Sequence, residues 1–180
     1  MVDVGGGFHR GGAGEWDGIG ADVQAARSVD VGCVRITERH LRADSPSDRD
    51  VGSAEAFATQ ALAGAFAGVP VDKARTWVGV AGTVTTLSAI AQELPEYDAE
   101  RTHLARLSLD QLRATTAALL ASTHDERAGN PAIHPGRVDV IAGGAVIVQV
   151  FAEELHARAG IDELVVSEHD ILDGIALGLA

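Results

Sequence analysis

Residues 75–86 read RTWVGVAGTVTT, and this stretch decides the fold. Its first half, residues 75–81, is short, apolar and rich in β-branched side chains, which predicts a buried strand. Gly82 and Thr83 follow at once and open a helix that we predict over 84–94. A strand that passes through a glycine directly into a helix is typical of α/β proteins, and it directs the positive end of the helix toward any anion at that edge.

The rest of the chain repeats this alternation in both directions. We predict that residues 1–7 form a short strand running into a glycine turn, and that further strands lie at 22–29, 104–107 and 163–167. We predict further helices at 31–42, 51–67, 108–121, 137–158 and 170–179, the fourth of them apolar enough to be buried on most sides. Strands that alternate with helices predict one α/β domain with a mostly parallel sheet, and the segment at 104–107 is expected at its edge.

Composition limits the classes of partner. Hydrophobic residues make up 46% of the 180 residues and the net charge is −12. Such an acidic domain is a poor match for nucleic acid or an anionic membrane, although a small polyanion can still be held locally. We see no signal peptide and no run of about 18 apolar residues that could cross a membrane, so we expect a cytoplasmic location. The single cysteine, Cys33, excludes an internal disulfide and is expected to be buried.

Two predicted strands are followed directly by glycine, and these two places are the candidates for an anion-binding site. In the first, Asp3 precedes Gly5, Gly6 and Gly7: the carboxylate can face a metal ion, and the glycine amides can point at an anion. In the second, Gly82 and Thr83 begin a helix. Each junction alone is more often a tight turn or a helix cap. Together, at strand ends where ligands usually bind, they leave an anion site and a purely structural role equally supported.

A family resemblance rests on segments that occur in a fixed order, at residues 3–7, 28–39, 79–86, 134–141 and 166–175. Together they resemble the Ppx/GppA phosphatase family. The resemblance implies an RNase-H-like domain of the actin-like, sugar-kinase and Hsp70 ATPase superfamily. It also implies a hydrolase that removes terminal phosphate from polyphosphate or guanosine pentaphosphate with Mg²⁺. By the same resemblance, Gly5, Gly6, Gly7, Gly82 and Thr83 would bind phosphate, and Asp3 would face the metal.

Family members have two such domains with the active site between them, and residues 1–180 resemble the second. The resemblance assigns the water-activating glutamate and the first phosphate loop to the other domain. We therefore expect this chain to be nearly inactive alone, and to work with a separately encoded first domain or as a homodimer. A non-catalytic module that binds phosphate, a nucleotide or a protein partner, and a decayed gene product, are the alternatives.

The chain departs from the family just after Gly7. The family continues with Ser-Thr-Glu and an apolar strand, whereas this chain has Phe8, His9 and Arg10. Residues 8–13 can be encoded TTC CAC CGA GGT GGT GCT, and a shift of one base gives codons for Ser-Thr-Glu-Val-Val-Leu. We therefore interpret residues 8–14 as a frameshifted segment, with ordinary loop divergence as the alternative. The coding DNA decides between them.

Other polar residues receive structural interpretations. His134 and His169 are predicted to cap or support neighbouring elements, because no cluster of His, Asp and Glu has metal-ligand spacing. Arg137 and Asp139 are predicted to begin the long helix and to form an ion pair there or between domains, in preference to binding phosphate.

Overall fold

The computed structural model describes residues 2–3, 25–170 and 173. Within these residues a sheet of four strands has the order β1-β2-β4-β3, formed by Val2–Asp3, Trp77–Val80, Glu163–Val166 and Arg106–Ser108. The strands β1, β2 and β4 are parallel, and β3 joins the edge beside β4 in the antiparallel sense. The predictions of a mostly parallel sheet and of an edge strand near 104–107 are confirmed.

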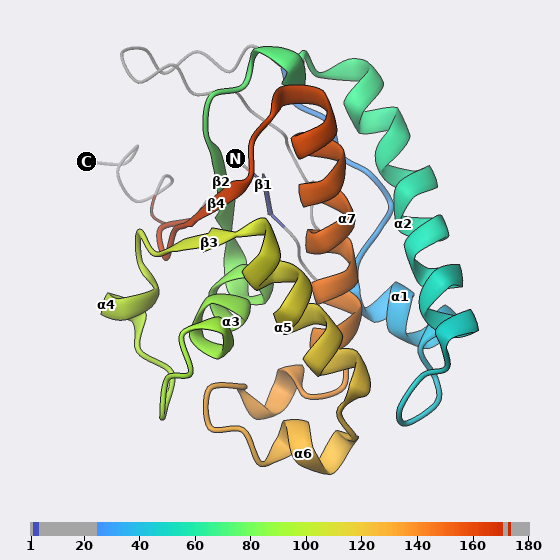
Figure 1. Ribbon diagram of the computed structural model, residues 1–180, viewed down its shortest axis with the longest axis vertical. Helices are drawn as coiled ribbons and strands as arrows, with labels where there is room; N and C mark the ends of the chain where they lie inside the picture. The colour runs from blue at the N-terminus through green and yellow to red at the C-terminus, as the bar shows by residue number, and fades with distance from the viewer. Residues whose placement is uncertain (1, 4–24, 171–172, 174–180) are drawn as a thin grey trace.

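Four of the described helices pack against the apolar helix formed by Ile141–Ala159, whereas two short ones lie away from it (Figure 1). The α-helices are α1 Cys33–His40, α2 Asp48–Gly68, α3 Ala81–Ala91, α4 Ala99–Thr102, α5 Leu109–Ala121, α6 His124–Ala128 and α7 Ile141–Ala159. Short 3-10 turns occupy Val71–Lys73 and Pro135–Arg137. Helix α7 contacts α1, α2, α3 and α5, so it is surrounded by other elements, as its apolar sequence predicts. None of the helices in the described ranges is both long and apolar enough to cross a bilayer.

The core joins the sheet to α7 through apolar side chains. Phe151 of α7 stacks against Phe66 of α2 and Trp77 of β2, with ring centroids 5.1 and 5.4 Å apart. Cys33 is 6% exposed, as predicted, and burial raises the pKa of its thiol. The thiol is therefore a packing group in its resting protonated form.

Several predicted boundaries were wrong for local reasons. Helix α7 begins at Ile141 and not at 137, because the 3-10 turn Pro135–Arg137 precedes it. His134 caps that turn by accepting a hydrogen bond at Nδ1 from the Gly136 amide (3.1 Å), which confirms its predicted capping role. Residues 25–29 form no strand; Ala25 and Val29 pack on the core without a strand partner. Residues 22–24 and most of the predicted helix 170–179 lie outside the described residues.

Leu104 has a strained backbone that predicts a stabilising substitution. Its φ is 60°, its side chain is 63% exposed, and its amide donates a hydrogen bond to the Val166 carbonyl (2.8 Å). A left-handed conformation costs a side-chain-bearing residue roughly 1–2 kcal/mol. We expect Leu104→Gly to raise the free energy of unfolding by about 1 kcal/mol in urea denaturation.

Leu104→Ala is the matched control, because it removes the same exposed side chain but keeps Cβ. Its stability should stay close to that of the parent chain. Equal gains in the glycine and alanine variants would show that the exposed leucine, and not the backbone, is unfavourable.

Candidate functional site

The first candidate residues lie where β1 and β2 end together. Asp3 is paired with Val80 across the parallel ladder, so β1 ends beside the start of α3. Gly82 and Thr83 are the second and third residues of that helix. Gly5, Gly6, Gly7, the Asp3 side chain and the segment 8–14 lie outside the described features. The register therefore brings the two strand ends together, while the glycine turn itself remains a prediction.

Helix α3 begins without a loop and without a side-chain cap. Ala81 has a φ of 68°, and this left-handed residue turns the strand directly into the helix. Val80 occupies the N-cap position and its side chain accepts no hydrogen bond. The amide groups of a first helical turn have no acceptor within the helix. Among the residues that the structure describes, no side chain supplies one, so these amides are available to an anion.

The first turns of α1, α3 and α7 are in contact. A methyl group placed on Gly144 would meet the Thr83 side chain at 2.6 Å and the Cys33 Cβ at 3.4 Å. One placed on Gly143 would meet the Cys33 carbonyl oxygen at 2.7 Å. The two glycines of α7 therefore let the beginnings of three helices approach one another. Thr83 is 5% exposed, and its side chain packs into this contact.

The same three helices lack side-chain caps. Their N-cap residues are Gly32, Val80 and Val140, and none of these accepts a capping hydrogen bond. The other described α-helices are all capped, by Ser47, Asp98, Ser108 and Thr123. Three helix ends with partial positive charge thus lie together, and none of their own N-cap side chains supplies an oxygen to them. We call this place the three-helix junction: the first turns of α1, α3 and α7.

Arg137 adds a full positive charge to the three-helix junction. Its guanidinium lies against Gly82, where a methyl group would overlap it, and its charge also acts on the Cys33 thiol. The Arg137 side chain makes no ion pair or hydrogen bond with the described residues. Arg137 does not begin the long helix, as was predicted: it lies in the turn before α7 and its guanidinium reaches Gly82 at the start of α3. The alternative of an ion pair between domains stays a prediction. Asp139 is instead paired with His124 of α6 (3.2 Å).

The described side chains form no metal centre of their own. No group of three His, Cys, Asp or Glu residues within the described ranges could hold an ion. His169 is exposed and lies 3.3 Å from Asp173, a local pair that supports the end of β4. Mg²⁺ is usually bound by one or two carboxylates together with water and substrate phosphates. A single strand-end carboxylate, as at Asp3, is therefore compatible with that ion.

Comparison with known proteins identifies the family. The model of the Ppx/GppA phosphatase family matches residues 1–178. This chain belongs to the Ppx/GppA phosphatase family. Among curated Ppx/GppA-related proteins, it is 49% identical over all 180 residues to "Exopolyphosphatase 2" of two Mycobacterium tuberculosis strains, covering 55% of that relative.

Solved structures of Ppx/GppA proteins agree with the fold. An exopolyphosphatase-like protein matches 99% of this chain and 58% of its own, with a TM-score of 0.91 and 41% identity. The Aquifex aeolicus Ppx/GppA phosphatase in its type II variant matches with a TM-score of 0.82 and 26% identity, over 98% of this chain and 55% of its own. The predicted RNase-H-like α/β fold class is confirmed. The chain spans about half the length of these relatives.

Proposed function

We propose that this chain forms the phosphate-binding half of a hydrolase that removes terminal phosphate from inorganic polyphosphate or guanosine pentaphosphate. The observation that carries the proposal is the three-helix junction, where uncapped first turns meet beside Arg137. A terminal phosphoryl group carries negative charge on several oxygens, and helix ends with an arginine are suited to it. Membership of the Ppx/GppA phosphatase family and the name of the mycobacterial relative support this choice of substrate.

In the proposed reaction, water attacks the terminal phosphorus in line with the bridging oxygen. The bond from that oxygen to the terminal phosphorus breaks, so that inorganic phosphate and the shortened chain are released. The amides at Gly82 and Thr83, the predicted amides at Gly5–Gly7 and the Arg137 guanidinium would stabilise the charge on the phosphoryl oxygens. Mg²⁺ held at Asp3 would supply further charge neutralisation. The carboxylate that activates the water would come from outside this chain, from a first domain or a partner subunit.

Phosphate release tests the proposal directly. We expect the chain to bind tripolyphosphate and to release almost no phosphate from polyphosphate with Mg²⁺. Addition of the amino-terminal half of the mycobacterial relative should then restore hydrolysis. Turnover of the chain alone at ordinary enzymatic rates, roughly 1–10³ s⁻¹, would contradict the proposal that it forms only half of the active site. Binding without hydrolysis in every combination would instead favour the non-catalytic module.

A further inference from the structure

Tyr97 is an exposed aromatic ring that is held in place from behind. It is the only tyrosine of the chain, and its side chain is 41% exposed. Its hydroxyl donates a hydrogen bond to Glu168 Oε1 (2.6 Å) and lies within hydrogen-bonding reach of the Thr85 side chain. The same Glu168 oxygen is bonded by the hydroxyl of Thr102, which is fully buried. The polar tip is therefore anchored while part of the ring faces outward.

The Tyr97 ring lies at the same end of the sheet as the three-helix junction, where β2 and β4 end. Glu168 follows β4, which pairs with β2, and the Ser167 amide bonds the Gly79 carbonyl (2.9 Å). On the other side, Thr85 lies three residues from Gly82, about 4.5 Å along α3. The hydrogen bond to Glu168 thus holds the Tyr97 hydroxyl near Thr85, next to the first turns of α3.

The negative charge around Tyr97 favours a neutral ligand over an anionic one. The segment beside it is acidic, with Glu93, Glu96, Asp98 and Glu100. Burial, followed by the hydrogen bond to Glu168, raises the pKa of Tyr97, so its phenol is neutral near pH 7. A long inorganic polyphosphate would be repelled if it ran over these carboxylates. A neutral nucleobase would not be repelled, and it could stack on the ring.

We propose that Tyr97 is a stacking subsite for the base of a nucleoside polyphosphate whose phosphates occupy the three-helix junction. The inference rests on the proposed phosphate site and names one class of its ligand. An anchored ring loses little conformational freedom when a base stacks on it, so the contact favours nucleotides over inorganic polyphosphate.

Selective isotope labelling of tyrosine tests the subsite in the full 180-residue chain. One tyrosine gives one set of ring signals, which can be followed during titration with GTP and, separately, with inorganic tripolyphosphate. We expect GTP to shift the Tyr97 ring signals upfield, as a stacked purine does, and tripolyphosphate to leave them nearly unchanged. Equal ring shifts with both ligands would overturn the subsite.

Substitutions separate stacking from loop support. Tyr97→Leu should weaken GTP binding roughly tenfold and leave tripolyphosphate binding unchanged, because only the base contact is lost. Tyr97→Phe keeps the ring and should retain most of the GTP affinity. If Tyr97→Leu lowers both affinities equally, or neither, the residue supports the fold and the subsite is refuted. If the parent chain binds neither ligand, the proposed phosphate site and the subsite both fail.

Discussion

Arg137→Gln is expected to weaken tripolyphosphate binding by roughly ten- to a hundredfold. The guanidinium lies against Gly82 with no carboxylate partner among the described residues, so its charge is available to a ligand at the start of α3. A hydrogen bond to a charged group contributes about 1.5–3 kcal/mol, which corresponds to this loss. Titration calorimetry at fixed salt and pH measures the change, while fold stability should be little altered.

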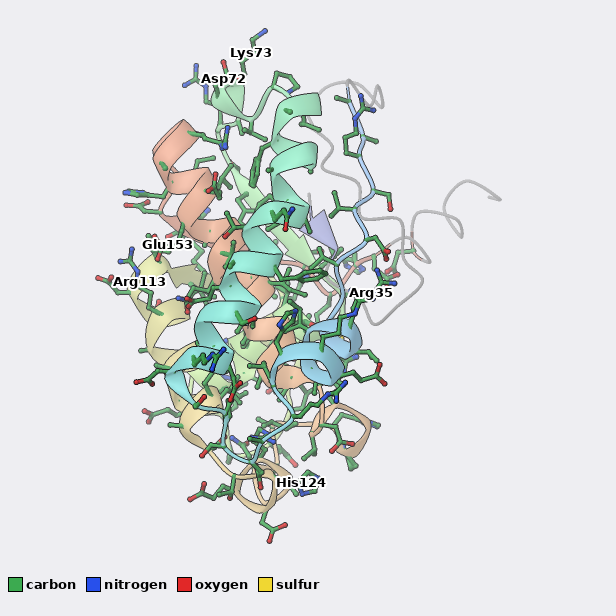
Figure 2. The ribbon with its side chains drawn as sticks, turned by 90° about the vertical axis from the view of Figure 1, so that its right-hand side faces the viewer. Arg35, Asp72, Lys73, Arg113, His124 and Glu153 are labelled. Carbon is green, nitrogen blue, oxygen red and sulfur yellow. The ribbon has the colours of Figure 1, made fainter. Side chains whose placement is uncertain are left out.

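Arg113→Gln is the matched control, because it removes the same charge elsewhere. Arg113 of α5 bonds Glu153 of α7 through two contacts of 2.7 and 2.8 Å. Figure 2 shows this pair on the side of the molecule opposite Arg35 of α1. Glu153 is nine residues, about 13.5 Å, along α7 from Gly144. Equal losses of affinity in the two variants would mean that net charge, and not the position of Arg137, determines binding.

Gly143→Ala is expected to lower the free energy of unfolding by about 2–3 kcal/mol. The added methyl group would lie 2.6 Å from the Thr37 hydroxyl oxygen and 2.7 Å from the Cys33 carbonyl oxygen. The carbonyl belongs to the α1 backbone and cannot rotate away, so α1 and α7 must separate. Overpacking of this kind typically costs 1–3 kcal/mol. Chemical denaturation measures the loss, and tripolyphosphate affinity should fall as well, because two of the three helix starts move apart.

Gly64→Ala is the same substitution at a site where we expect the free energy of unfolding to rise and not to fall. Gly64 lies within α2, and a methyl group there would have no atom within 4 Å. Alanine is more favourable than glycine in a helix by about 1 kcal/mol, so this variant should be more stable than the parent chain. A stabilising effect at both glycines would show that α1 and α7 are not in close contact at Gly143.

Local patterns in the sequence predict much of the fold. The strand that runs through Gly79 into α3 and the helix predicted at 108–121 both appear in the structure where their residue types place them. These features depend on neighbours within a few positions, so one sequence is enough to find them. The long apolar helix was found for the same reason, although its start was misplaced by a single proline turn.

The three-helix junction could not be predicted in this way. Arg137 follows Gly82 by 55 residues, and only the packing of α7 against α3 brings them together. The absence of side-chain caps could not be predicted either. Gly32, Val80 and Val140 can be recognised as N-cap residues only when the helix starts are known. Sequence patterns indicated Gly82 and Thr83, whereas Arg137 was assigned a structural role. The Gly5–Gly7 turn stays a prediction, and so does the frameshift at 8–14, which the coding DNA can test.

The most direct measurement is a backbone amide NMR titration of the 180-residue chain with tripolyphosphate. If a polyanion binds where the uncapped helices meet, the largest shifts will come from the first turns of α1, α3 and α7, including Cys33, Gly82 and Gly143. The capped first turns of α5 and α6 should remain unchanged. Shifts that are largest at those capped turns, or that are absent throughout the first turn of α3, would contradict a phosphate site at the three-helix junction.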